Sequence, residues 1–370
     1  MIDFRSDTIT RPTEAMRAAM SRAAVGDDVF GDDPTVNRLQ EHAAELLGFE
    51  AALFAPSGTQ TNLIALMAQC QRGDEAIVGQ MSHTYRWEAG GMAVLGSIQP
   101  QPLENQPDGS LRLEDIAAAI KPDDPHFART RLVGLENTIG GKVLPLAYLA
   151  KVAELAHSRG LVMHLDGARL FNASVEIARV DANSAEAGAH LGMADPKLPA
   201  ILAAARAICS HFDTVSVCLS KGLGAPVGSL VLGSAEAIQR GRRVRKMLGG
   251  GMRQAGVIAA GGLHALEHHV ERLPLDHANA RHLGQGLRKI ADSAGPLQGR
   301  LTVVDPATNI LFVDVDPQIA AAFNAHLERH GVGVTGGSYH GGVRQRWVTH
   351  LDVDRADVDR ALEIVAAFKG

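Results

Sequence analysis

The chain has 370 residues, of which 46% are hydrophobic and 21% charged, and its formal net charge at pH 7 is −5. This length suits two domains, and the composition is that of an ordinary globular protein. The negative balance gives no electrostatic basis for binding nucleic acid or an anionic membrane, so neither partner is expected.

The chain also lacks the signals of export. Its first residues contain no apolar segment typical of a secretory leader, and nowhere do 18 apolar residues follow one another. Three cysteines, Cys70, Cys209 and Cys218, are too few for a disulfide framework and are expected to be reduced core residues. We therefore expect a cytoplasmic protein that does not span a membrane.

Short apolar runs alternate with helical patterns in the first two thirds of the chain. Strands are expected at 51–55, 76–78, 132–135, 161–165 and 214–219, and helices at 35–47, 60–71 and 146–158. Such alternation predicts a mostly parallel sheet with helices on both faces. The stretch 181–199, rich in Ala, Gly, Asp and His, is expected to be a surface insertion.

The pattern changes after residue 248. A glycine-rich turn at 249–251 begins a long helical region to about 290, and a mixture of strands and helices follows it at 301–304, 310–315, 318–330, 343–351 and 355–368. The predicted organisation is a large α/β domain over 1–248, with an N-terminal arm, and a small C-terminal α+β domain over 249–370.

Two of the expected strands end in chemically useful residues. Asp166 follows the run 161–165, and Lys221 follows the run 214–219. Open α/β sheets bind ligands at the carboxyl ends of their strands. A pyridoxal phosphate enzyme needs a lysine to hold the aldehyde as a Schiff base and an acid to pair with the pyridinium nitrogen. Either fragment alone is as well explained by an Asp-Gly turn or a solvated lysine, so the prediction rests on the pair.

Three further features fit such a cofactor. Ser57, Gly58 and Thr59 lie between a strand and a helix, where backbone N–H groups and the helix dipole hold phosphate, although an ordinary N-cap has the same appearance. His83 follows a short strand and is a candidate to stack on the pyridine ring. Arg346 could bind a substrate carboxylate through its two-pronged guanidinium group.

Two rival motifs are weaker. The segment 222–228, Gly-Leu-Gly-Ala-Pro-Val-Gly, departs from a dinucleotide fingerprint because its third glycine is one position late and Pro226 stands where a helix should begin. His264, Glu267 and His268 match a metal-binding pattern in letters, but no further acidic ligand is identifiable. We therefore expect neither a nicotinamide cofactor nor a catalytic metal, while the sequence leaves open whether a structural ion is bound.

Six segments in order resemble the low-specificity L-threonine aldolases, which are pyridoxal phosphate enzymes of fold type I, the aspartate-aminotransferase-like group. They are residues 5–12, 25–34, 57–60, 166–169, 219–224 and 249–254. The resemblance covers nearly the whole chain. It implies a homotetramer built from catalytic dimers with shared active sites.

The resemblance also implies roles for individual residues. Lys221 would form the Schiff base, Asp166 would pair with the pyridinium nitrogen, and His83 would stack on the ring. The implied cofactor site is completed by Ser57, Gly58, Thr59, Arg169 and Ser220, with Lys246 and Arg253 reaching it across the dimer interface. The implied substrate carboxylate site contains Ser6, Arg169 and Arg346, and His126 would lie near the β-hydroxyl.

The implied reaction is retro-aldol cleavage of L-threonine, L-allo-threonine and related β-hydroxy-α-amino acids to glycine and an aldehyde. The base that takes the β-hydroxyl proton is His83, His126 or a bound water. Two departures from the family's pattern occur: Phe30 stands where relatives often have tyrosine, and the 181–206 region is longer than in compact members. The alternatives are a β-eliminating lyase or aminotransferase acting on a small amino acid, and a binding protein without catalytic activity.

Overall fold

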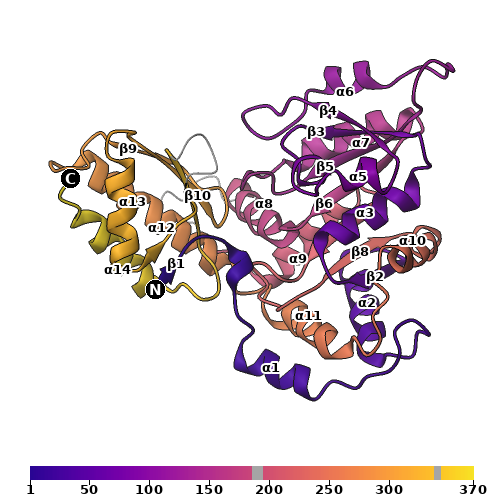
Figure 1. Ribbon diagram of the computed structural model, residues 1–370, viewed down its shortest axis with the longest axis horizontal. Coiled ribbons are helices and arrows are strands. Elements are labelled where there is room, and N and C mark those ends of the chain that lie inside the picture. Colours follow the sequence, from indigo (N-terminus) through magenta and orange to yellow (C-terminus); the bar gives the residue numbers. More distant parts are fainter. Residues whose placement is uncertain (186–194, 337–342) are drawn as a thin grey trace. The chain divides into compact units, whose positions relative to one another are not determined.

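The computed structural model describes residues 1–185, 195–336 and 343–370 (Figure 1). They form two compact units: the larger is Pro12–Glu271, and the smaller joins Met1–Arg11 to Arg272–Gly370. The division falls later than the boundary expected at 248, because helix α11 (Gly256–His268) packs against α1 (Glu14–Ser21) and α2 (Pro34–Leu47) of the larger unit.

A seven-stranded sheet is the centre of the larger unit, with strand order β2-β8-β7-β6-β5-β3-β4. The strands are β2 (Ala51–Ala55), β3 (Glu75–Gly79), β4 (Gln99–Leu103), β5 (Thr130–Glu136), β6 (Val162–Gly167), β7 (Thr214–Cys218) and β8 (Ser229–Gly233). From β4 to β7 all neighbours are parallel, whereas β8 is antiparallel to both β7 and β2. All residues of β3, β7 and β8 are buried, as expected of strands covered on both faces of a sheet. The predicted mostly parallel sheet is confirmed.

The edge strand β4 has no counterpart among the expected strands. Its sequence, Gln-Pro-Gln-Pro-Leu, contains Pro100 and Pro102, which have no N–H to donate. The strand pairs with β3 alone, and an edge position tolerates prolines that a central strand would not.

Helices flank this sheet (Figure 1). Besides α1, α2 and α11, they are α3 (Gly58–Gln69), α4 (His83–Arg86), α5 (Gly91–Val94), α6 (Leu113–Ala119), α7 (Leu146–Ser158), α8 (Leu170–Ala185), α9 (Leu198–Cys209) and α10 (Ala235–Met247). Helix α3 packs on β6, β7 and β8, and α7 packs on β6. The expected insertion at 181–199 begins in the last turn of α8, and its residues 186–194 lie outside the described residues.

The smaller unit is α+β. Its elements are β1 (Ile2–Asp3), the 3-10 helix η1 (Asp7–Ile9), α12 (Leu273–Asp292), β9 (Leu301–Val304), β10 (Ile310–Val315), α13 (Ala320–Arg329), β11 (Val332–Gly333), β12 (Arg344–Val348) and α14 (Arg355–Ala366). The N-terminal arm joins this unit because β1 pairs with β11. The single helical region expected up to 290 is two helices, since Pro274 in the first turn of α12 cannot continue a preceding helix.

Two expectations about the whole chain can be compared with the structure. All three cysteines are free and buried, as expected of core residues. Over the described ranges, no helix combines the length and apolarity needed to cross a membrane.

Candidate active site

The carboxylate and the amine predicted from the sequence lie at one edge of the sheet. Strands β6 and β7 are parallel neighbours, with Asp166 paired to Ser216 in register. Asp166 is 2% exposed, and its Oδ1 accepts a hydrogen bond of 3.0 Å from the backbone N–H of Ala168. Lys221 follows the end of β7 by three residues and is half-buried. Both groups therefore stand at the carboxyl end of the parallel strands.

The N-terminus of α3 has hydrogen-bond donors without acceptors. The Ser57 hydroxyl caps the helix by accepting from the backbone N–H of Gln60 at 3.2 Å. The N–H groups of Gly58 and Thr59 have no acceptor among the described residues. The buried hydroxyl of Ser229 lies beside Gly58 and also has no partner there. These unpaired donors at the positive end of a helix suit a phosphate group.

His83 begins the short helix α4, just beyond the end of β3. Its backbone N–H donates to Oε2 of Glu136 at 2.7 Å, which ties the loop to the end of β5. Its ring Nδ1 lies 2.8 Å from Oε1 of Glu88. This hydrogen bond raises the pKa of His83, the negative charge of Asp166 raises it further, and the charge of Lys221 lowers it.

Glu136 places a further carboxylate at the same edge of the sheet. It is paired in register with Asp166 on the neighbouring strand. Desolvation raises the pKa of Glu136 to about 8, with repulsion from Asp166 adding to the shift, while Lys221 acts in the opposite direction. His83, Glu136, Asp166 and Lys221 therefore form one electrostatic cluster.

A buried polar network supports this cluster and was not predicted from the sequence. Its members are Asn62 on α3, Glu88, His164 on β6 and Thr214 on β7. Burial raises the pKa of Glu88 and lowers the pKa of His164 to about 4. The available signal was polar residues inside otherwise apolar elements, such as Asn62 in the Thr61–Leu66 run.

Two other predicted residues lie near this site and one does not. Arg169 is half-buried and lines a small cavity together with Gly222, and Ser220 Oγ lies 3.4 Å from Cys218 Sγ. His126 stands in the loop before β5, exposed, with its Nδ1 2.7 Å from Asp124 Oδ1. That loop is at the amino end of the parallel strands, so the chain does not bring His126 to its own Asp166.

The glycine-rich turn at 249–251 packs beside the first turn of α3. Gln60 Nε2 donates to the backbone oxygen of Leu248 at 3.2 Å. Lys246 is exposed, and Arg253 pairs with Asp27 at 2.9 Å while remaining 55% exposed. Both cations are therefore held on the surface of the larger unit. Phe30, in the same region of the sequence as Asp27, is 77% exposed.

Two predicted substrate residues belong to the smaller unit. Ser6 Oγ accepts from the backbone N–H and the hydroxyl of Thr8, at 3.2 and 2.8 Å. Arg346, on β12, donates from Nη2 to the backbone oxygen of Arg5 at 3.2 Å. Arg346 therefore contacts the residue that precedes Ser6, and both predicted substrate residues lie close together in the smaller unit.

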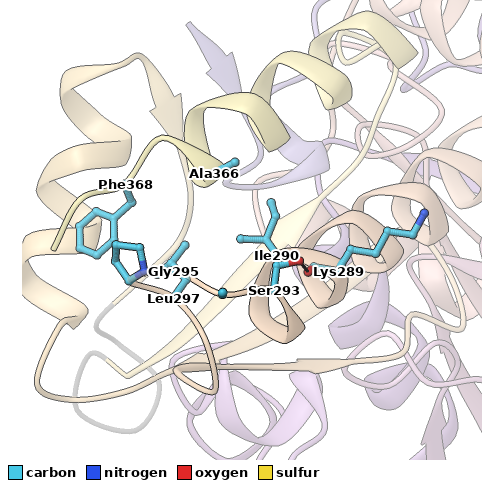
Figure 2. Close-up of a pocket in the computed structure, with 9 residues that line it drawn as sticks. Lys289, Ile290, Ser293, Gly295, Leu297, Ala366 and Phe368 are labelled. Carbon is cyan, nitrogen blue, oxygen red and sulfur yellow. Dashed lines mark hydrogen bonds between the residues drawn. The ribbon is translucent and has the colours of Figure 1, made fainter.

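The first rival motif lacks the helix that it requires, and a carboxylate of the second has an ion-pair partner. Residues 222–228 connect β7 to the antiparallel β8, without the helix that a dinucleotide fingerprint requires. Glu267 pairs with Arg38 at 2.9 Å. A separate hollow in the smaller unit has a mainly apolar lining that includes Ile290, Leu297 and Phe368, with Lys289 at its side (Figure 2). It contains no predicted site residue.

The sheet order, with its single reversed strand, and the cluster at its carboxyl edge define a class: this is an α/β enzyme with the fold of the type I pyridoxal phosphate enzymes. A solved structure titled as Leishmania major threonine aldolase shares that fold, with a TM-score of 0.75 at 20% identity, covering 99% of this chain and 98% of the other.

Sequence comparison narrows the class. The family model described as beta-eliminating lyase matches residues 3–316. A low specificity L-threonine aldolase of Escherichia coli K12 is 48% identical over 100% of this chain and 98% of its own. Low-specificity L-threonine aldolase 1 of Arabidopsis thaliana is 42% identical, covering 98% and 94%. The chain belongs to the beta-eliminating lyase family and, within it, to the low-specificity L-threonine aldolases.

Proposed function

We propose that this chain cleaves L-threonine, L-allo-threonine and related β-hydroxy-α-amino acids to glycine and an aldehyde, using pyridoxal 5'-phosphate. The observation that carries the proposal is the placement of Asp166 and Lys221 at the ends of adjacent parallel strands. The identity of 48% to a curated low specificity L-threonine aldolase supports the choice of reaction.

The unpaired donors of Gly58, Thr59 and Ser229 fit the phosphate of this cofactor. When bound, the cofactor supplies a protonated ring that accepts electrons from a bond breaking at the substrate Cα. Lys221 holds the cofactor through its ε-amine, and Asp166 keeps the ring nitrogen protonated. Ser57 caps the helix that receives the phosphate, Ser220 precedes the lysine in the same turn, and His83 covers the ring.

Substrate binding and proton transfer are assigned to other side chains. Ser6, Arg169 and Arg346 bind the amino-acid carboxylate. Glu88 holds the proton of His83 on Nδ1, which leaves Nε2 to accept the β-hydroxyl proton. His126 can assist only at the site of another subunit, because in its own chain it stands at the opposite edge of the sheet.

Product analysis tests the proposed reaction. The enzyme loaded with pyridoxal phosphate is given L-threonine, L-allo-threonine, phenylserine and D-threonine, and glycine and aldehyde are measured. Release of a 2-oxo acid and ammonia instead would identify a β-eliminating lyase. Absence of cofactor binding would leave a non-catalytic protein with this fold.

Arg346→Leu is expected to weaken substrate binding far more than cofactor binding, because a bidentate guanidinium–carboxylate contact is lost. We expect KM for L-threonine to rise about tenfold to a hundredfold, the range expected for one charge-assisted contact of about 1.5 to 3 kcal/mol. Retention of cofactor through dialysis is the control. Equal losses of both would assign Arg346 to the fold of the smaller unit.

We further propose a cytoplasmic homotetramer of catalytic dimers, in which Lys246 and Arg253 serve the neighbouring subunit's phosphate. The exposure of both side chains supports this, because a phosphate dianion is better held with added cations. Arg253 would exchange its ion pair with Asp27 for the phosphate. The three free cysteines suit a reducing compartment.

Mixing of two inactive variants tests the shared site. Lys221→Ala chains combined with Arg253→Ala chains are expected to form hybrid dimers in which one site has both residues, so activity returns. If subunit exchange is demonstrated and no activity returns, Arg253 serves its own chain.

A further inference from the structure

One side-chain amide stands between two buried carboxylates. Asn62 is 1% exposed, and its Nδ2 lies 2.9 Å from Asp166 Oδ2 and 2.8 Å from Glu88 Oε1. An amide nitrogen carries two hydrogens, so it can donate one to each carboxylate. Asp166 and Glu88 are themselves 2% and 7% exposed, and water therefore does little to separate their charges.

The surrounding hydrogen bonds fix the orientation of this amide. Asn62 Oδ1 lies 3.2 Å from Nε2 of His164, which is neutral at physiological pH because burial lowers its pKa to about 4. An amide oxygen can only accept, so His164 must carry its hydrogen on Nε2. His164 Nδ1 then accepts from the Thr214 hydroxyl at 2.9 Å, and that hydroxyl accepts from Gln69 Nε2 at 2.6 Å. The reversed amide would place its oxygen against two carboxylates.

We propose that Asn62 is a positioning residue that keeps Asp166 and Glu88 ionised together through its two amide hydrogens. The inference rests on the proposed function. Asp166 is then available to a protonated ring nitrogen, and Glu88 to the Nδ1 hydrogen of His83. Asn62 thus determines the charge of Asp166 directly and the proton position of His83 through Glu88, although it touches neither the cofactor ring nor the substrate.

The negative charges around Asp166 and Glu88 explain why both amide hydrogens of Asn62 are needed. One ring nitrogen of His83 and one carboxylate oxygen each of Glu88 and Asp166 lie within 4.8 Å of one another. Glu136 adds a third carboxylate from β5, and Lys221 and the His83 ring both lower its pKa. Burial raises the pKa of Glu88 most, and repulsion from Asp166 adds to this, whereas the hydrogen bonds with His83 and Asn62 lower it. Without Asn62, one of the two carboxylates should keep a proton to higher pH.

The test compares cofactor binding by Asn62→Leu and by the wild-type apoenzyme across the range from about pH 6 to about pH 9, around the ordinary titration range of histidine. Absorbance titration gives the dissociation constant of pyridoxal phosphate. We expect binding by the variant to be at least about tenfold weaker at the acidic end, equivalent to one pKa unit, with the difference closing as pH rises. A carboxylate whose pKa is raised is protonated below that pKa, and there it weakens cofactor binding. Above that pKa it is ionised in both proteins, so their dissociation constants become equal.

Thr61→Val is the matched control. It removes the contacts of Thr61 Oγ1 with Ser216 Oγ at 2.6 Å and with the backbone oxygens of Ser57 and Gly58 at 3.4 and 3.0 Å, without touching either carboxylate. Any loss of affinity from these contacts does not involve a titrating group, so it should be the same at every pH. Its dissociation constant should follow the wild-type dependence on pH. A deficit of Asn62→Leu that is the same at every pH, or no deficit, would show that Asn62 only fills space.

Neutron diffraction from wild-type crystals supplies a measurement that needs no variant. We expect deuterium on Nε2 of His164 and both Asn62 deuterons directed at the carboxylates. Deuterium on Nδ1 of His164, with the amide reversed, would overturn the inference. If wild-type enzyme bound no pyridoxal phosphate, the proposed function would fail, while the neutron result would still decide the placement of these hydrogens.

Discussion

Lys221→Ala is expected to abolish the visible absorbance of bound cofactor and to lower kcat more than about a thousandfold, a barrier increase of about 4 kcal/mol. Alanine has no amine with which to hold the cofactor aldehyde. Water cannot replace the lysine amine, because water is not held in a fixed position beside the aldehyde. Spectra of the purified protein and turnover of L-threonine measure the two effects.

The control for this change is Lys151→Ala, which removes an exposed lysine on α7, away from the strand ends. It should leave both spectrum and turnover unchanged. Activity at a tenth of the wild-type rate, with normal absorbance, would contradict the assignment of Lys221.

Asp166→Asn is expected to keep the cofactor bound but to lower kcat about a hundredfold to ten-thousandfold. The lost interaction is a buried charge pair, for which removal of one partner typically costs about 3 to 5 kcal/mol. A neutral asparagine no longer keeps the ring nitrogen protonated, so the ring becomes a poor acceptor of electrons. Cofactor content after gel filtration and kcat for L-threonine give the two quantities.

Asp115→Asn serves as the comparison, since Asp115 is an acidic residue on α6 that pairs with Arg112. We expect no change in kcat. A variant Asp166→Asn that lost cofactor and kcat in the same proportion would indicate that Asp166 holds the cofactor without tuning it.

The sequence was most informative where an element is bounded on both sides by local signals. The expected strands 51–55, 301–304 and 310–315 match β2, β9 and β10, because each is an apolar run between turns. The strand-end positions of Asp166 and Lys221 could be read in the same way. The edge strand β4 could not, since its prolines are acceptable only at a position that the tertiary fold defines.

The polar network needed the tertiary structure. Asn62 and Asp166 are 104 residues apart, and they meet because α3 packs across β6 and β7. No local pattern distinguishes Asn62 from any other polar residue on a buried helix. His126 illustrates a different limit: a family resemblance implied its role, but the parallel pairing of β5 with β6 places it at the end of the strands opposite Asp166.

Because β8 is antiparallel to β7, one loop carries Lys221 and then reaches Ser229, beside Gly58. The segment between Cys218 and Ser229 leaves the sheet edge, carries Lys221, and returns to the same edge beside Gly58. The amine of Lys221 and the Ser229 hydroxyl beside the anion cradle are therefore carried by the same connection. Insertions or deletions there would alter the path of the chain around Lys221 and Ser229, whereas the loop before β5 can vary in length without this effect. Efforts to redesign substrate range should accordingly keep the 219–228 loop at its present length.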